Sequence, residues 1–110
     1  MTKLPGQPVR GSLTGRPVMV LLDAMGKRWT LRIIWELHRN GPGTFRELQA
    51  RCEDVSPTSL NNRLKELRDF QLVKHDETGF ALTEQGVSLS RVLAPLDKWA
   101  RIWADSLDKT

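Results

Sequence analysis

The amino-acid sequence predicts a mainly α-helical fold with one small β-hairpin, of the winged helix-turn-helix type, with an added C-terminal helix. Two helical patterns, 45–52 and 56–70, are separated only by the short turn that joins a helix-turn-helix pair. A strand–turn–strand pattern follows over 72–83, at the position of a wing. A long helical region then closes the chain and carries apolar residues on two faces.

The composition is that of an ordinary globular domain. Of the 110 residues, 39% are hydrophobic and 27% charged, which suits one domain with a modest core. The formal net charge of +4 favours an anionic partner, because cation–phosphate contacts release counterions. A single cysteine rules out an internal disulfide framework. The apolar run 18–22 is too short for a membrane span and no signal-peptide pattern is visible, so we expect a cytoplasmic protein.

The chain is predicted to begin with an arm. Residues 1–15 are rich in Gly, Pro, Ser and Thr, which favours a flexible segment before a domain that spans 16–110. A mostly apolar helical pattern covers 17–25, and Gly26 is expected to close that helix as its C′ residue.

The next two helices are separated by a strong stop signal. A second helix is expected over 27–39, followed by the Asn-Gly-Pro-Gly turn at 40–43. Thr44 is then an N-cap for the helix 45–52, because Glu47 stands at the spacing that completes a capping box.

The helix 56–70 has the features of a recognition helix. Ser56 is a good N-cap and Pro57 suits the first helical position. One face carries an apolar stripe at i, i+4, i+7 spacing, formed by Leu60, Leu64 and Leu67. The opposite face carries small polar and basic groups, among them Thr58, Ser59, Asn62 and Lys65. The alternative is an ordinary solvated amphipathic helix.

The wing and the last helix follow without a break. Strands are expected at 72–75 and 80–83 around a tight turn at 76–79. Thr83 caps a helical region that continues to about residue 107. Pro95 is expected to kink this region or divide it in two, because its ring blocks an interior hydrogen bond.

The exposed polar face of 56–70 predicts contact with double-stranded DNA. Asn and Arg pair bidentately with adenine and guanine edges, and Lys, Ser and backbone N–H groups suit phosphates. Arg63 has an alternative, which is to turn back and pair with an acid; Arg51 is an optional further phosphate contact. The predicted DNA-binding residues are Arg46, Ser56, Pro57, Thr58, Ser59, Asn61, Asn62, Arg63, Lys65, Lys74 and His75.

Other chemistry finds little support in the sequence. Cys52 has no neighbouring His or second Cys, so packing is favoured over a redox role. His38 and His75 belong to no metal-ligand spacing. No nucleophile–base arrangement and no phosphate-binding glycine loop is present. We therefore expect no enzyme, no metal and no cofactor.

Several short motifs occur in a fixed order between about Pro17 and Trp99. They are Gly26-Lys27-Arg28-Trp29-Thr30-Leu31, Gly41-Pro42, Phe45-Arg46-Glu47-Leu48, Val55-Ser56, Leu60-Asn61-Asn62-Arg63-Leu64-Lys65-Glu66-Leu67, Leu82-Thr83-Glu84-Gln85-Gly86, and Val92-Leu93 with Leu96 and Trp99. In their order and spacing these motifs resemble the HxlR-type family of bacterial transcriptional regulators.

Four departures from the family pattern limit what the resemblance implies. Arg16 stands where many members carry a cysteine, so oxidant sensing at that position is not carried over. The hairpin 74–80 is short and has no arginine for the minor groove. Gln71 replaces the glycine that commonly ends the recognition helix, and Pro95 comes four residues after the family's proline position.

The family resemblance implies dimerisation through the first and last helices, here 17–25 and 84–107. The two apolar faces of the last helix independently favour a homodimer, with one face packed inward and the other on a partner; the alternative is that the wing and first helix cover both. The predicted interface residues are Val18, Leu21, Leu22, Leu89, Val92, Leu93, Leu96, Trp99, Ala100, Trp103 and Leu107.

The sequence as a whole predicts a homodimeric, sequence-specific regulator, expected to be a repressor on an inverted-repeat operator. One alternative is a winged-helix module that binds protein, favoured by the short acidic-tipped wing. A second is a regulator gated by a small-molecule effector at the dimer seam. In that case the ligand would lie among Trp29, Trp35, Trp99 and Trp103.

Overall fold

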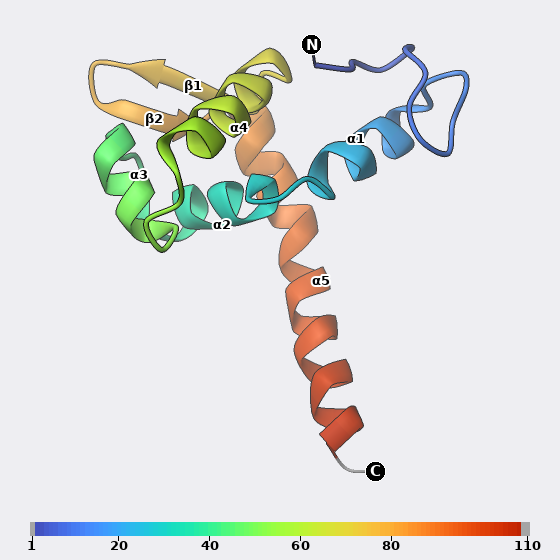
Figure 1. Cartoon of the computed structure of the whole chain (residues 1–110). Coiled ribbons are helices and arrows are strands. Elements are labelled where there is room, and N and C mark those ends of the chain that lie inside the picture. The colour runs from blue at the N-terminus through green and yellow to red at the C-terminus, as the bar shows by residue number, and fades with distance from the viewer. Residues whose placement is uncertain (1, 109–110) are drawn as a thin grey trace.

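The computed structural model describes residues 2–108 as a mainly helical chain with one hairpin (Figure 1). Met1 of the predicted arm, and Lys109 and Thr110 of the predicted domain, lie outside the described residues. The elements in chain order are α1 (Pro17–Met25), α2 (Thr30–Asn40), α3 (Phe45–Arg51), α4 (Pro57–Asp69), β1 (Val73–Asp76), β2 (Gly79–Leu82) and α5 (Glu84–Asp108). The predicted fold class, a winged helix-turn-helix with an added C-terminal helix, is confirmed.

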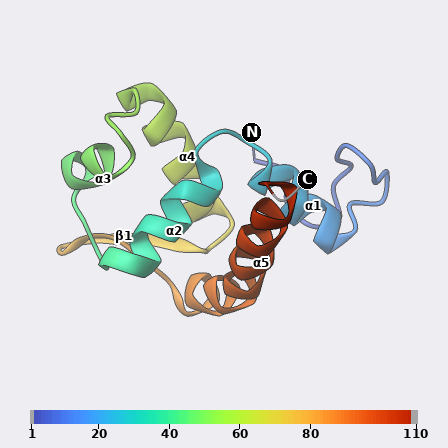
Figure 2. The same cartoon turned by 90° about the horizontal axis from the view of Figure 1, so that it is seen from below.

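Helix α2 lies between α3 and α5 (Figures 1 and 2), and the hydrophobic core gathers around it. Burying an aliphatic side chain contributes roughly 1.5–3 kcal/mol relative to leaving it exposed, so this cluster holds the helix-turn-helix as one unit. Its fully buried members are Ile33, Ile34, Leu48, Cys52, Leu60, Leu64 and Leu67. The predicted apolar stripe of the recognition helix is therefore the part of α4 that meets the core.

The predicted start of the second helix at Lys27 is wrong. Helix α2 begins at Thr30, because Trp29 adopts a left-handed conformation with φ 77° that a right-handed helix cannot contain. Gly26 follows α1 as predicted but keeps φ −74°, so it is not a left-handed C′ residue. The left-handed residue between α1 and α2 is thus Trp29, which packs partly buried against the core, and not the glycine.

The two strands lie closer to the turn than predicted: β1 is one residue later in the chain and β2 one residue earlier. The N–H of Leu72 closes the end of α4 by bonding to the Leu67 carbonyl at 3.0 Å, which leaves Val73 as the first strand residue. At the other end Asp76 pairs with Gly79, so only two residues form the turn. Phe80 also exchanges two backbone hydrogen bonds with Gly43, of 3.0 and 2.7 Å, which ties the hairpin to the turn after α2.

Helix α5 is one continuous element, so of the two outcomes expected at Pro95 the division of the helix is wrong, and the kink stays a prediction. A proline removes one interior hydrogen bond, and here both Pro95 and Arg91, whose carbonyl loses the bond, are exposed to water. The C-terminal half of α5 projects away from the other helices (Figure 1). No described helix combines the length and the apolar character needed to cross a membrane.

Residues 2–15 form a small loop that packs beside α1. The Gly6 N–H bonds to the Gly15 carbonyl at 2.9 Å, and Val9 pairs with Ser12 across its tip. Near the start of the loop, the Thr2 hydroxyl donates to Asp69 at the end of α4 at 2.7 Å. The flexibility of this arm stays a prediction.

Candidate nucleic-acid interface

Helix α3 begins with the predicted capping box. The Glu47 N–H donates to the Thr44 hydroxyl at 3.1 Å, and the Thr44 N–H donates to Glu47 Oε1 at 2.9 Å. The backbone hydrogen bond from Thr44 is the main reason that the pKa of Glu47 lies below its usual range. This reciprocal pair sets the direction in which α3 leaves the turn after α2.

Helix α4 begins at Pro57 with Ser56 as its N-cap, as predicted. The Ser56 hydroxyl accepts the Ser59 N–H at 3.2 Å and donates to the Ser59 hydroxyl at 2.9 Å. The cap lies at the solvent-exposed end of the helix. An exposed helix start with free N–H groups and a positive dipole end suits a phosphate.

The outer face of α4 is open to solvent along its length. The three leucines that point the other way are buried, so the helix is divided sharply into a core face and an exposed polar face. Nine of the predicted DNA-binding residues are exposed, namely Arg46, Ser56, Pro57, Thr58, Asn61, Asn62, Lys65, Lys74 and His75, while Ser59 and Arg63 are half-buried.

Arg63 takes the alternative that the sequence left open. Its Nη2 lies 2.7 Å from Glu66 Oε1, one turn along the same helix. The second oxygen of Glu66 accepts from Lys27 Nζ at 2.9 Å, which links α4 to the turn between α1 and α2. Arg63 therefore lies on the flank of the exposed face, held by an internal partner.

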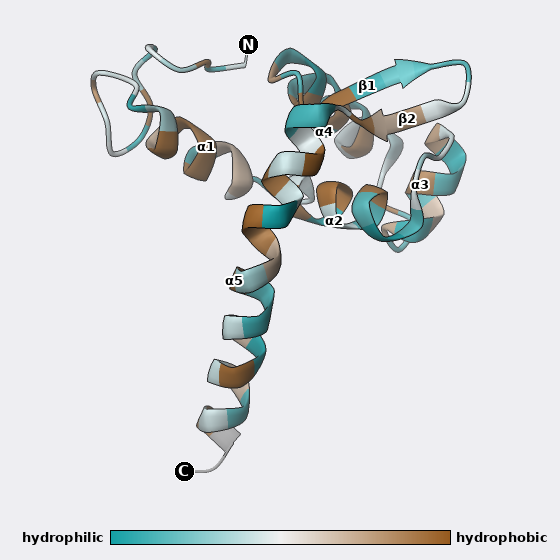
Figure 3. Cartoon of the chain, turned by 180° about the vertical axis from the view of Figure 1, so that it is seen from behind, coloured by the Kyte–Doolittle hydropathy of each residue, from teal (hydrophilic) through white to brown (hydrophobic). Residues whose placement is uncertain are grey.

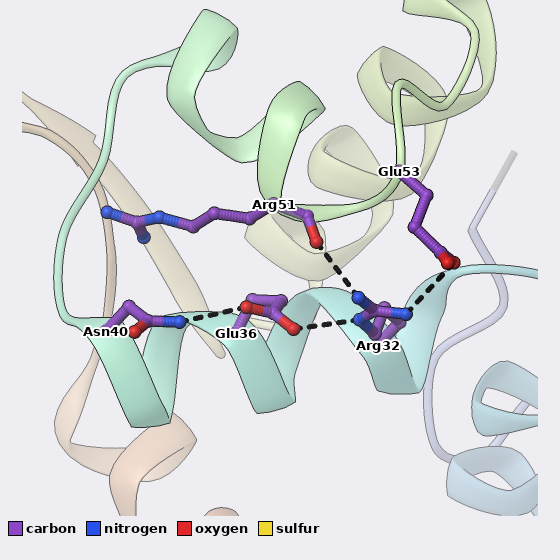
Figure 4. Close-up of polar contacts among 5 residues, drawn as sticks. All are labelled: Arg32, Glu36, Asn40, Arg51 and Glu53. Atoms are coloured by element: carbon purple, nitrogen blue, oxygen red, sulfur yellow. Dashed lines mark hydrogen bonds and ion pairs between the residues drawn. The ribbon is translucent and has the colours of Figure 1, made fainter.

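A polar network centred on Arg32 fixes the turn between α3 and α4 (Figure 4). Arg32 Nε donates to Glu36 Oε2 at 2.8 Å, Nη2 donates to the Arg51 carbonyl at 3.0 Å, and Nη1 lies 3.3 Å from Glu53 Oε2. The hydrogen bond to Glu36 is the largest cause of the raised pKa of Arg32. Asn40 donates to the other oxygen of Glu36 at 2.9 Å. One guanidinium thus joins α2 to the end of α3 and to the turn that follows it.

Sequence reasoning misses this network. The i, i+4, i+8 spacing of Arg32, Glu36 and Asn40 is a local signal for contacts along one helix face. No spacing points to the carbonyl of Arg51, because that contact exists only after α3 packs beside α2.

The turn itself is tight and carries two left-handed residues. Glu53 and Asp54 both have φ 56°, and the Asp54 N–H bonds to the Gln49 carbonyl at 2.9 Å. The Gln49 side chain then donates to the Val55 carbonyl at 3.0 Å, just before α4 begins. These bonds satisfy the backbone groups of the turn and hold the recognition helix at a defined angle to α3.

The wing presents exposed groups on β1. Lys74 Nζ lies 4.0 Å from Asp76 Oδ2, a loose contact that leaves the ammonium accessible. The ring of His75 stacks on Phe80 with centroids 4.0 Å apart and planes 4° apart. Hydrogen bonds from the Thr78 hydroxyl and N–H, in that order of importance, lower the pKa of Asp76 and rigidify the tip.

Two further candidates, Arg51 and Cys52, serve the packing of the fold. Arg51 donates to the carbonyls of Gly41 and Pro42 at 2.8 and 3.3 Å, so it ties down the turn after α2 and is not free for the optional phosphate contact. Cys52 is fully buried, and burial raises the pKa of its thiol, which favours the packing interpretation. Within residues 2–108, no group of three potential metal ligands comes together.

The projecting part of α5 carries an exposed apolar stripe, seen as recurring brown segments in Figure 3. Val92 is 70% exposed and Trp99 61%, so the alternative in which the wing and first helix cover both faces is wrong for the single chain. Ile102, 60% exposed, belongs to this stripe and is absent from the predicted set. Of the predicted interface residues, Val18, Leu22, Val92, Leu96, Trp99, Trp103 and Leu107 are exposed, and Leu21, Leu89, Leu93 and Ala100 are half-buried.

Leu89 and Leu93 face the other way and pack against the core, as one inward face requires. An apolar groove of about 550 Å³ lies between α2 and α5, lined by Leu31, Arg32, Trp35, Leu93, Leu96, Asp97 and Ala100. Trp35 alone of the four tryptophans borders it, so the four do not surround one site in the single chain. Trp99 and Trp103 instead stack on each other with centroids 5.9 Å apart.

Comparison with known proteins gives a consistent picture. A family model described as HxlR-like helix-turn-helix matches residues 24–108. The uncharacterized HTH-type transcriptional regulator YvaP of Bacillus subtilis is 36% identical over 91 residues, which cover 76% of this chain and 83% of that protein. The crystal structure of quinone-bound YodB from B. subtilis superposes with a TM-score of 0.71 at 32% identity, covering 76% of this chain and 94% of that one.

A possible HxlR family transcriptional factor from Thermoplasma volcanium superposes with a TM-score of 0.67 at 29% identity, over 82% of this chain and 83% of that one. These similar proteins are described as transcriptional regulators or factors, not as enzymes.

Proposed function

The chain belongs to the HxlR-like family of helix-turn-helix transcriptional regulators, and from this premise we propose that it is a homodimeric repressor that reads an inverted-repeat operator with α4. The observation that carries the proposal is the division of α4 between a buried leucine face and an exposed face of Asn, Thr and Lys side chains. A face without aliphatic or aromatic groups suits DNA better than protein.

The exposed residues divide into two roles. Asn61 and Asn62 are the proposed readers of base edges, since an amide can donate and accept in one plane. Thr58 and Ser59 are the further candidates for base contacts, whereas Arg63, predicted with them, is paired with Glu66. Phosphate contacts are assigned to the start of α4 at Ser56 and Pro57, and to Arg46, Lys65, Lys74 and His75.

The proposed dimer explains the exposed stripe of α5. A helix that presents two tryptophans and several aliphatic residues to water exposes more apolar surface than a single domain normally leaves uncovered. A two-fold axis through this stripe, together with α1, would place two α4 helices to read half-sites about 34 Å apart or a multiple of that.

A small-molecule effector is a second element of the proposal. The similar protein YodB has been crystallised in a quinone-bound form, and the groove between α2 and α5 in this chain is lined mainly by apolar side chains. An apolar ligand in that groove is expected to quench Trp35 emission and to change DNA affinity. A Trp35→Phe variant that loses the quenching but keeps DNA binding would locate the ligand; unchanged emission across an apolar ligand panel would count against it.

DNA binding is tested by fluorescence anisotropy on the DNA upstream of the protein's own gene. Asn62→Ala is expected to lose about 1–3 kcal/mol of discrimination against random DNA. Lys65→Ala should make the dependence of log K on log salt shallower by about 1, whereas Lys98→Ala, which deletes the same charge from an exposed position on α5, should not. Equal effects of the two lysine variants would contradict the assignment of α4 as the contact surface.

The dimer is tested by sedimentation equilibrium. Trp103→Glu is expected to give a monomer, because it places a charge in the apolar stripe. The matched control is Leu13→Glu, which adds the same charge at a side chain 89% exposed on the N-terminal loop. A monomeric wild type, or dissociation by both variants, would rule out the α5 interface.

A further inference from the structure

We propose that Glu66 is a positioning residue that holds Arg63 back from DNA and thereby sets the selectivity of α4. The proposal rests on the proposed function, because it concerns the same DNA-binding surface. Lys27, Arg63 and Glu66 form a charged cluster on the flank of α4, beside the turn between α1 and α2.

One carboxylate in this cluster holds two cations. Glu66 Oε1 lies 2.7 Å from Arg63 Nη2, and Oε2 lies 2.9 Å from Lys27 Nζ. The side chains of Glu66 and Arg63 are only 17% and 21% exposed, so both are partly shielded from screening by solvent. Charge-assisted hydrogen bonds at these distances are among the stronger contacts of a protein surface.

Arg63 is incompletely satisfied in this arrangement. Among the described residues, its Nε is buried without a hydrogen-bond partner. A buried donor without an acceptor is unfavourable, because it loses its water without gaining a replacement. An extended Arg63 side chain would expose Nε to water or to phosphate oxygens, so the ion pair with Glu66 is what keeps the guanidinium turned inward.

Arg63 lies close to the proposed DNA contacts of α4. Arg63 lines a hollow of about 490 Å³ together with Asn62 and Lys65, two of the proposed DNA contacts. Successive helix residues differ by about 100° in direction, which places Arg63 next to Asn62 at the edge of the exposed face. A change of side-chain rotamer therefore suffices to bring its charge to a phosphate without moving the helix.

The consequence for selectivity follows from the charges. A phosphate contact strengthens binding to every DNA sequence alike, whereas the asparagines distinguish base pairs. By holding Arg63, Glu66 limits the sequence-independent part of the affinity. A DNA-binding protein with fewer free cations on its reading face discriminates better against the large excess of non-specific DNA.

The test compares Glu66→Ala with Asp69→Ala. Asp69 lines the same hollow and carries the same charge, but its described contact is with Thr2 and not with Arg63. For Glu66→Ala we expect the salt dependence of binding to a short random duplex to steepen by about 1 and the affinity for it to rise about tenfold, with a smaller gain for the selected operator. Asp69→Ala should leave the salt dependence unchanged.

A double-mutant cycle attributes the effect to Arg63. In an Arg63→Ala background, Glu66→Ala is expected to change neither the salt dependence nor the selectivity. If the steepening persists without Arg63, or if Glu66→Ala protein with an unchanged melting temperature shows none, the proposal is overturned and Glu66 is a structural clamp between α4 and the α1–α2 turn. Glu66→Gln, which keeps the side-chain shape, serves if the alanine variant does not fold.

The outcome is separable from that of the proposed function. A wild type that shows no preference for any upstream DNA over random DNA contradicts sequence-specific regulation, while the random-duplex comparison still measures the release of Arg63. A selective wild type whose Glu66 variants behave like the Asp69 control overturns only the role of Glu66.

Discussion

Replacing Gln71 with glycine is expected to stabilise the protein. Gln71 follows the C-cap of α4 with φ 61°, a left-handed conformation. Its N–H bonds to the Arg68 carbonyl at 2.9 Å, and the next N–H, from Leu72, bonds to the Leu67 carbonyl at 3.0 Å. This pair of bonds is a Schellman motif, whose left-handed position usually holds glycine.

The expected gain is about 1 kcal/mol. A left-handed conformation costs a residue with a Cβ roughly 1–2 kcal/mol, and the greater freedom of glycine in the unfolded chain offsets roughly 0.5–1 kcal/mol of that. The Gln71 side chain is exposed, and its carbonyl, which accepts from the Thr83 hydroxyl at 2.6 Å, is unchanged by the substitution. For a domain of this size, the gain corresponds to a rise in melting temperature of about 4 °C.

Thermal unfolding followed by circular dichroism measures this, with all proteins at one concentration because a dimer's melting temperature depends on it. Gln71→Ala is the matched control, since it removes the same side chain but keeps a Cβ in the left-handed position. The alanine variant should be no more stable than wild type. If glycine and alanine give equal stability, conformational strain at Gln71 is not the cause.

Three further outcomes are expected. Glu47→Gln should lower the melting temperature at pH 7, because a carboxyl with a lowered pKa stabilises the fold above its unfolded value near 4.3. The difference from wild type should shrink as the pH falls through the folded pKa, and a difference that is constant with pH would contradict this. Cys52 should react with a thiol reagent only after unfolding, since it is buried with a raised pKa, and prompt labelling of the native protein would refute it. Arg32→Ala should cost about 1–2 kcal/mol of stability, because the buried Glu36 carboxylate loses its charged partner. It should also weaken DNA binding, because the α3–α4 turn is no longer bonded to α2. Arg32→Lys keeps the positive charge but lacks the planar guanidinium that bonds to several groups at once. DNA binding equal to wild type in that variant would show that the link between α2 and the α3–α4 turn is unnecessary.

Most of the fold could be predicted because its signals are local. Thr44 and Glu47 mark the start of α3, and Ser56 followed by Pro57 marks the start of α4, since a cap satisfies backbone groups within the next turn. The buried stripe of α4 follows from spacing along one helix. The exposed polar face opposite it, and hence the candidate DNA surface, could be recognised for the same reason.

The errors lie where distant segments decide the conformation. The apolar character of Trp29 predicts a place inside a helix, but packing against the core holds this residue in a left-handed turn. The division of the last helix expected as one outcome at Pro95 does not occur, because Arg91 and Pro95 are exposed and a carbonyl that loses its helical bond there is open to water. Arg63 is not among these errors, because the sequence left open that it turns back to an acid, and Glu66, one turn later in the same helix, is its partner.

The sequence by itself determined the succession of helices and hairpin, the caps and the division of α4 into a buried and an exposed face, because each depends on residues a few positions apart. Tertiary structure alone decided which charges are free. Arg51 looks available for a phosphate in the sequence, but in the fold Arg51 and Arg32 hold the turns on either side of α3. The carbonyls of Arg51, Gly41 and Pro42 come within reach of these guanidinium groups only through packing, and no spacing along the chain encodes those distances.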